Sequence, residues 1–289
     1  MLIHKIVRYL NDIGLFKFES DEKYLRKRYK KIFGKELNLE NPKTFNEKMQ
    51  WLKLNDRNPL YTKLVDKYEV KKYVSSLIGE EYIIPTLGIY NKFSEIDFKE
   101  LPNQFVMKCT HDSGGVYICK DKSKKNKIRQ RIKFNLMLKR NYYYRNREWP
   151  YKNIKPRIII EKYMTDESKK ELKDYKFFCF NGIVKYMKVD FNREIEHRAN
   201  YYDREFNLQE FGEKICPPDY SKIIKKPQNY NKMVELAEEL SKNIPFVRID
   251  FYNVNGQIYF GEITFYPDGG MGEFIPKEWD GKLGNLINL

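Results

Sequence analysis

Residues 246–264 read FVRIDFYNVNGQIYFGEIT, and this stretch decides the fold. Two runs rich in β-branched and aromatic residues flank Asn255 and Gly256, a dipeptide typical of tight hairpin turns. The stretch therefore predicts two antiparallel strands, 246–252 and 257–264. The charged residues within this hairpin and the segments upstream of it carry further information.

Three charged residues, Arg248, Asp250 and Glu262, interrupt these otherwise apolar strands. A three-residue loop, 254–256, places Arg248 opposite Glu262 and puts all three charges on one face. A two-residue loop instead places Asp250 and Glu262 on opposite faces. Two carboxylates on one face suit Mg²⁺ bridged to phosphate, because hard cations prefer oxygen ligands. A structural salt bridge between Arg248 and Glu262 is the alternative.

Upstream of the hairpin, helical patterns come first and strands with interspersed helices follow, which predicts an α+β fold. Thr44 and Glu47 form a capping-box pattern, and a further helix runs from about residue 60 to Gly79. Asn181 and Gly182 predict a second hairpin. We expect three regions: a helical N-terminal part at 1–80, a first subdomain at 81–160 and a second at 161–289.

A long basic helix is expected at about 123–146. Its residues Ile128, Ile132, Leu136 and Lys139 are spaced as one face. The run from Lys120 to Lys133 is strongly basic. It is typical of a solvated helix face near a phosphate site, or of a module that binds anionic lipid or nucleic acid.

Charge points to an anionic partner, because 55 Lys and Arg against 40 Asp and Glu give a net charge of +15. Nucleic acid is disfavoured, since neither zinc-finger spacing nor an RNP-like motif is present. No apolar run is long enough to span a bilayer, and no signal-peptide pattern is recognisable, so we expect a cytoplasmic protein. The basic amphipathic pattern of residues 1–35 favours a solvated helix face or peripheral contact with an anionic membrane at its inner side. The four cysteines show no metal-binding spacing.

Two further segments carry candidate ligand-binding residues. Lys108 leaves a predicted strand and precedes a small-residue loop, which suits polyphosphate, although such a loop is also an ordinary turn. The loop comprises His111, Asp112, Ser113, Gly114 and Gly115. Glu161 ends a run of three isoleucines and can accept an adenine amino group or pair with Lys162 or Lys176.

Together, the Lys108 loop, the strand end at Glu161 and the hairpin at 246–264 resemble the motifs of the ATP-grasp superfamily. They occur in the same order along the chain as in those enzymes. The wider sequence, over about 38–284, resembles its TupA-like branch, whose enzymes act in teichuronopeptide and capsular polysaccharide synthesis. The motifs that carry the resemblance are NPKTFNEK at 41–48, DKY at 66–68, Lys108 with HDSGG at 111–115, DYKFFCFNG at 174–182 and GEITFYP at 261–267.

The resemblance implies an ATP-grasp fold of two α+β subdomains and an ATP- and Mg²⁺-dependent carboxylate–amine ligase. Lys108 would contact the α- and β-phosphates, and the 111–115 loop would close over the β/γ end. Adenine would be read by Glu161 with Lys162, Tyr163 and Met164. Asp174 or Lys176 would lie near the ribose or phosphates. Asp250, Glu262 and Thr264 would hold Mg²⁺, and Arg248 would stabilise the acyl phosphate.

The acceptor expected from the resemblance is an acidic glycan or lipid-linked saccharide, in which a uronic-acid carboxylate is amidated. A glycosyltransferase of capsular polysaccharide synthesis is the alternative, although the Asp-x-Asp motif frequent in such enzymes is absent from the sequence. A non-catalytic basic module is the third.

Overall fold

The computed structural model describes residues 9–15, 18–124, 126–165, 173–192 and 196–289. The chain forms two compact units. Unit 1 comprises residues 1–24, 57–73 and 84–164, and unit 2 comprises 25–56, 74–83 and 165–289. This division differs from the expected ranges 1–80, 81–160 and 161–289, because the helices of the first 80 residues are distributed over both units.

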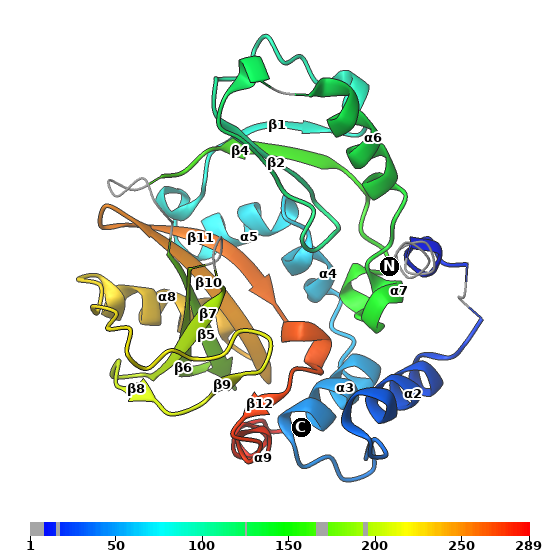
Figure 1. Cartoon of the computed structure of the whole chain (residues 1–289), viewed down its shortest axis with the longest axis vertical. Coiled ribbons are helices and arrows are strands. Elements are labelled where there is room, and N and C mark those ends of the chain that lie inside the picture. Colours follow the sequence, from blue (N-terminus) through cyan, green and yellow to red (C-terminus); the bar gives the residue numbers. More distant parts are fainter. Residues whose placement is uncertain (1–8, 16–17, 125, 166–172, 193–195) are drawn as a thin grey trace. The chain divides into compact units, whose positions relative to one another are not determined.

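Unit 1 contains a four-stranded antiparallel sheet in the order β1-β4-β2-β3 (Figure 1). Its strands are β1 (Thr86–Tyr90), β2 (Phe105–Cys109), β3 (Tyr117–Cys119) and β4 (Ile158–Lys162). Alternate residues of β2 and β4, such as Met107 and Ile160, pack with Phe134 and Met137 of α6 (Lys127–Leu138) in one apolar core. The opposite sheet face carries Lys108 and Glu161.

Two predicted helices are each broken in the structure. The helix expected from residue 60 to Gly79 is α4 (Leu60–Val65) followed by α5 (Glu69–Ile78). Asp66 causes the break, because its Oδ1 accepts hydrogen bonds from the backbone N–H of Tyr68 and of Glu69, at 2.8 and 3.2 Å. The helix expected at 123–146 is α6 and the short α7 (Tyr143–Asn146), and Asn126 caps α6.

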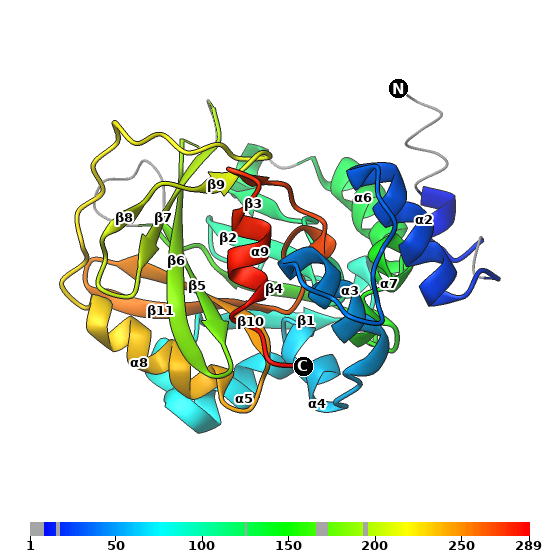
Figure 2. The same ribbon diagram turned by 90° about the horizontal axis from the view of Figure 1, so that it is seen from below.

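Unit 2 is built on a six-stranded antiparallel sheet in the order β11-β10-β5-β6-β7-β8 (Figure 2). Its strands are β5 (Asp174–Phe180), β6 (Ile183–Phe191), β7 (Arg198–Asp203), β8 (Leu208–Gln209), β10 (Phe246–Val254) and β11 (Gln257–Thr264). Helix α8 (Tyr230–Ser241) packs against β5, β6 and β10. The predicted turn at Asn181 and Gly182 is confirmed.

Further elements are helices α2 (Asp21–Phe33), α3 (Phe45–Asn55) and α9 (Trp279–Gly284) and the short strand pair of β9 (Gly212–Glu213) and β12 (Phe274–Ile275). The predicted capping box of Thr44 and Glu47 is confirmed at the start of α3. This helix also fixes the turn after β11, because Gln50 and Lys53 donate hydrogen bonds to the carbonyl oxygens of Gly270 and Gly269, at 2.5 and 2.6 Å.

The β10–β11 hairpin has a different register from the one expected. Asn255 and Gly256 have φ values of 52° and 85° and form a two-residue turn, with Val254 opposite Gln257. The three-residue loop is therefore wrong. A bulge at Gly261 inserts one extra residue into β11.

The bulge restores the shared face that a regular two-residue hairpin would lose. Beyond it Asp250 lies opposite Glu262, and Arg248 lies opposite Thr264 rather than Glu262. A Cβ atom at Gly261 would lie only 3.0 Å from the carbonyl oxygen of Asp250, so glycine suits this position.

Helix α6 turns the apolar face predicted from its residue spacing toward solvent and buries other residues instead. Ile128, Ile132 and Leu136 are exposed, whereas Phe134 and Met137 reach the core. For the N-terminal amphipathic pattern, residues 1–8 lie outside the described residues. Within the described part of the chain, no helix combines the length and apolarity needed to cross a membrane.

Candidate active site

In unit 1, a buried carboxylate lies between two lysines. Because side chains alternate along a strand, Lys108 of β2 and Glu161 of β4 share the sheet face opposite the core. Lys108 Nζ lies 2.5 Å from Glu161 Oε2, and Lys71 of α5 pairs with Oε1. Lys71 also donates hydrogen bonds to the carbonyl oxygen of Ile84 and to Thr86 Oγ1, at 2.7 and 3.0 Å.

This cluster has one positive charge in excess. Burial opposes ionisation of Glu161, but the nearby ammonium groups of Lys108 and Lys71 hold its pKa below the ordinary value. Burial lowers the pKa of Lys71, and Glu161 only partly offsets that effect. An anion such as a phosphate oxygen would complete the charge balance. Glu161 thus pairs with Lys71 and Lys108. The alternative to adenine binding that the sequence suggested was instead a pair with Lys162 or Lys176.

The 111–115 loop divides into an anchored and an exposed part. His111 and Asp112 are buried, and a His111 ring nitrogen lies 3.3 Å from the carbonyl oxygen of Met137. Burial lowers the pKa of His111. Lys67 donates to the backbone carbonyl of Asp112 at 2.6 Å. Ser113 and Gly114 are exposed and form the tip of the loop. The buried His111 and Asp112 therefore anchor the loop, and only its tip is accessible to a ligand.

The segment after Glu161 is only partly exposed at Tyr163 and Met164. The backbone N–H of Lys162 donates to the carbonyl oxygen of Pro85 at 3.0 Å, which ties the end of β4 to the start of β1. The Lys162 side chain is exposed. The segment is thereby held at the edge of the face that carries Glu161.

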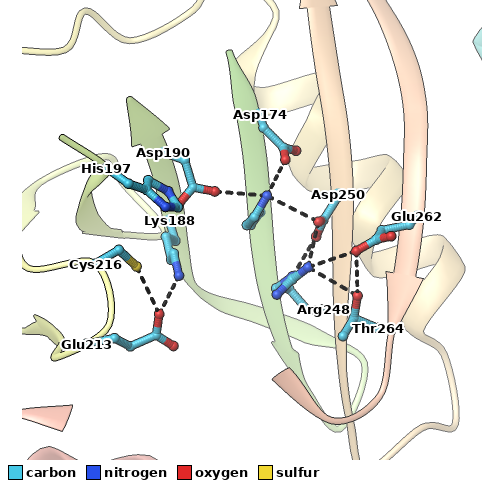
Figure 3. A network of polar contacts seen from close by, with 11 residues as sticks. Asp174, Lys188, Asp190, His197, Glu213, Cys216, Arg248, Asp250, Glu262 and Thr264 are labelled. Atoms are coloured by element: carbon cyan, nitrogen blue, oxygen red, sulfur yellow. Dashed lines mark hydrogen bonds and ion pairs between the residues drawn. The ribbon is translucent and has the colours of Figure 1, made fainter. Parts of the chain in front are cut away.

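In unit 2, charged side chains from four strands gather on the sheet face that α8 does not cover (Figure 3). Asp250 lies opposite both Lys176 and Glu262, and Asp174 lies opposite Asp190. Lys176 Nζ pairs with Asp174, and lies 2.9 Å from Asp190 and 3.4 Å from Asp250. Strand pairing thus brings together five ionisable groups from four strands, β5, β6, β10 and β11.

Arg248 holds the outer part of this face together. Its Nε and Nη2 donate to the two carboxylate oxygens of Asp250 at 2.7 and 2.8 Å. Nη2 also lies 3.1 Å from Glu262 Oε1 and 3.1 Å from Thr264 Oγ1. The structure contains both arrangements that the sequence left open: the salt bridge between Arg248 and Glu262, and the two carboxylates on one face.

These residues fit a divalent cation. Oxygens of Asp250, Glu262 and Thr264 converge on one nitrogen, and carboxylate and hydroxyl oxygens are the donors that Mg²⁺ accepts. The same position is taken by the Arg248 guanidinium, so a cation would compete with this side chain for the oxygens. Thr264 additionally donates to Glu262 Oε1 at 3.1 Å, which orients that carboxylate.

The unit 2 cluster has the opposite charge balance from the unit 1 cluster. Four carboxylates, Asp174, Asp190, Asp250 and Glu262, surround two cations, Lys176 and Arg248. Burial raises the pKa of Asp250, although Arg248 and Lys176 oppose that change. Burial would lower the pKa of Lys176, but the carboxylates of Asp250 and Asp174 raise it. A bound cation would relieve this negative excess.

A second polar group adjoins the same face. Lys188, opposite Lys176 on β6, pairs with the buried Glu213 of β9. His197 Nε2 lies 2.9 Å from Asp190 Oδ1, and Cys216 Sγ donates to Glu213 Oε2 at 3.6 Å. Donor atoms of Asp190, His197 and Cys216 lie within 4.8 Å of one another. The Lys188 ammonium beside Cys216 disfavours a dication there.

The sequence analysis missed Lys71, Lys188, Asp190, His197 and Glu213. Lys71 carried a weak signal, because it lies three residues before the buried Val74 on a short amphipathic helix. Lys188 and Asp190 alternate with apolar residues in β6, which marks them as sharing one face. No sequence signal places Glu213 or His197 beside them, because their positions depend on the packing of β9 and β7.

A family model described as TupA-like ATPgrasp matches residues 47–288. The chain belongs to the TupA-like ATP-grasp family. Both the expected family and the expected ATP-grasp fold of α+β type are thereby confirmed. No curated protein sequence matches the chain.

Solved structures with a similar fold include two D-alanine–D-alanine ligases. The enzyme from Helicobacter pylori has 14% identity, with 86% of this chain and 68% of that chain covered and a TM-score of 0.46. The enzyme from Bacillus anthracis has 16% identity, 83% and 67% coverage and a TM-score of 0.42. A third is the biotin carboxylase domain of 2-oxoglutarate carboxylase from Hydrogenobacter thermophilus with MgADP, at 15% identity, 78% and 46% coverage and a TM-score of 0.42.

Proposed function

We propose that this TupA-like ATP-grasp protein is an ATP- and Mg²⁺-dependent carboxylate–amine ligase that works through an acyl phosphate. The observation that carries the proposal is the convergence of Asp250, Glu262 and Thr264 oxygens on Nη2 of Arg248, a position that Mg²⁺ would take over from the guanidinium. Membership of the family supports the use of ATP.

In unit 1, the excess positive charge of Lys71 and Lys108 would bind the α- and β-phosphates of ATP. Glu161 holds both ammonium groups in place and would accept the adenine amino group on the side toward Tyr163 and Met164. The exposed tip of the loop, Ser113 and Gly114, would cover the terminal phosphates with backbone N–H groups.

In unit 2, Asp250, Glu262 and Thr264 would hold Mg²⁺, which neutralises charge on the terminal phosphates when bound. Arg248, released from part of its carboxylate contacts, would face the transferred phosphoryl group and stabilise the negative charge of the acyl phosphate and then of the tetrahedral intermediate. Lys176 would fix Asp250, and Asp174 would lie at the ribose or phosphates.

The reaction has two balanced steps. A carboxylate oxygen attacks the γ-phosphorus, the bond to the β-phosphate oxygen breaks, and ADP leaves. The amine nitrogen then attacks the acyl carbon, inorganic phosphate leaves with the bonding electrons, and the nitrogen loses a proton. Positioning and charge neutralisation would supply most of the acceleration.

We propose a uronic-acid carboxylate of a bacterial surface polysaccharide, or of its lipid-linked precursor, as the acceptor at the cytoplasmic face. The net charge of +15 supports a polyanionic acceptor. The polar group of Lys188, Asp190 and His197 adjoins the metal ligands and offers a place for a polar second substrate.

The test is ADP release from Mg–ATP in the presence of uronic acids and a panel of amines, with mass detection of the amide. We expect activity in the natural chain and a loss of at least tenfold in Lys108→Ala and in Glu262→Gln. Glu100→Gln, an exposed glutamate outside both clusters, is the matched control and retains activity. Unchanged ATP turnover in both site variants contradicts the proposal. Transfer of a sugar from a nucleotide sugar without ATP would instead support the glycosyltransferase alternative.

A further inference from the structure

Helix α6 of unit 1 exposes an apolar stripe that the core does not use. Ile128, Ile132 and Leu136 have exposed fractions of 74%, 58% and 43%. Their i, i+4, i+8 spacing places them in one line along the helix. Phe134 and Met137 point to the opposite side and are buried in the sheet core. The stripe is therefore surplus to folding, and its exposure to water is costly.

The charged residues that border the stripe are all cations. Arg129, Arg131 and Lys139 are exposed, and within the described part of the chain none of them forms an ion pair. From residue 122 to residue 147 the sequence contains no Asp or Glu. A helix with an apolar line between unpaired cations matches the chemistry of a surface that is apolar in depth and anionic at its boundary.

A cavity at the N-terminal end of the same helix adds a second observation. It has a volume of about 470 Å³ and is open to solvent. Its lining comprises Asp97, Phe98, Lys99, Lys122 and Lys127. Three ammonium side chains against the single carboxylate of Asp97 leave this lining with a net positive charge, which suits the phosphate of a lipid headgroup.

We propose that α6 docks unit 1 on an anionic phospholipid bilayer, with the Ile128–Ile132–Leu136 line inserted among the acyl chains and the flanking cations at the headgroups. Nucleic acid fits less well, because three aliphatic side chains offer no stacking surface for bases. Among the described residues, Ile223 is even more exposed, at 87%, but it lies outside the helices and strands and so is not part of such a line.

Binding of the full chain to vesicles tests the proposal. Sedimentation with phosphatidylglycerol–phosphatidylcholine vesicles is compared with sedimentation with pure phosphatidylcholine vesicles. We expect binding to the first and little to the second. The double variant Ile128→Gln/Ile132→Gln loses at least tenfold in affinity, whereas Ile223→Gln, with the same chemistry at an equally exposed site, binds normally.

A charge pair of variants separates specific contact from general attraction. Arg129→Gln/Arg131→Gln weakens binding by about fivefold per residue removed at low salt. Lys185→Gln/Lys225→Gln lowers the net charge equally at exposed positions of unit 2 and has a smaller effect. The result that overturns the proposal is binding that ignores the isoleucine substitutions, or binding to nucleic acid or an acidic protein but not to vesicles. None of these outcomes depends on ATP turnover.

Discussion

The two charged clusters of this ATP-grasp protein are built from the same kinds of side chain, with opposite balance. In unit 1, two lysines share the single carboxylate of Glu161. In unit 2, four carboxylates surround Arg248 and Lys176. The pKa of Glu161 is lowered by its two ammonium neighbours despite burial, whereas burial raises the pKa of Asp250 against the opposing effect of Arg248 and Lys176.

Each cluster therefore has an excess charge, positive in unit 1 and negative in unit 2, that a ligand of opposite charge would balance. A cluster with a positive excess favours phosphate, and one with a negative excess favours a metal cation. Under the proposed function, the phosphates and the Mg²⁺ of Mg–ATP would supply these charges. The opposite charge excess of the two clusters therefore supports the proposed binding of Mg–ATP. Substitutions in each cluster test this proposal, and the substitution with the largest expected effect is described first.

The largest effect is expected for Arg248→Ala. This change leaves the buried Asp250 with the more distant Lys176 as its cationic neighbour, and it should lower the free energy of unfolding by about 3–5 kcal/mol. Denaturant titration of the full chain measures this loss. Arg248→Lys keeps the charge but loses the two-pronged contact with Asp250, so it should recover part of the loss. Full stability of the alanine variant would mean that the pair is not important for the fold.

Glu161→Gln should cost less, about 2 kcal/mol, because Lys71 and Lys108 are partly exposed and can still reach water. The pKa of Glu161 is lowered in the folded state, so its contribution is present above its unfolded pKa and disappears as pH falls through the folded pKa. Urea denaturation at pH 7 and at pH 3 should therefore show a difference between wild type and variant that shrinks at acid pH. A difference independent of pH would contradict the role of charge.

Gly261→Ala should destabilise the hairpin by about 1 kcal/mol, because the new Cβ meets the carbonyl oxygen of Asp250 at 3.0 Å. The bulge also aligns Asp250 with Glu262, so Mg²⁺-dependent effects should weaken as well. Thermal denaturation with and without Mg–ATP measures both. Gly281→Ala, where no atom lies within 4 Å of the added Cβ, is the matched control and should be nearly neutral.

The smallest effect is expected at Thr264. Thr264→Val removes the hydroxyl that contacts Arg248 and Glu262 while keeping the shape, and should reduce Mg²⁺ affinity by about tenfold or less. Thr264→Ser keeps the hydroxyl and should behave as wild type. Titration of Mg²⁺ at fixed ATP distinguishes them, and equal affinities for Val and Ser would remove Thr264 from the proposed ligand set.

Local chemistry was readable from the sequence. The turns at Asn181 and Asn255 and the capping box at Thr44 depend on neighbouring residues only, and all three are in the structure. The predicted strand 257–264 matches β11, and the hairpin predicted at Asn181 joins β5 and β6. Their patterns are set by burial on one or both faces, which composition reveals.

Features that depend on a distant partner were not readable. The bulge at Gly261 shifts the register without any local signal, so the correct shared face of Asp250 and Glu262 was inferred from a wrong loop. Lys71 reaches Glu161 from another part of the chain. The apolar line of α6 was spaced like a core face, but the bulkier pair Phe134 and Met137 fills the core instead.

The most direct test of the two-cluster account is the thermal stability of three proteins with ATP alone and with Mg–ATP: wild type, Asp250→Asn and Lys108→Ala. A ligand that binds the folded state raises the melting temperature by mass action. We predict that ATP stabilises wild type and that Mg²⁺ increases the shift. Asp250→Asn should lose only the Mg²⁺-dependent part, whereas Lys108→Ala should lose most of the shift under both conditions. No shift in wild type at saturating Mg–ATP, or equal losses in both variants, would contradict the account.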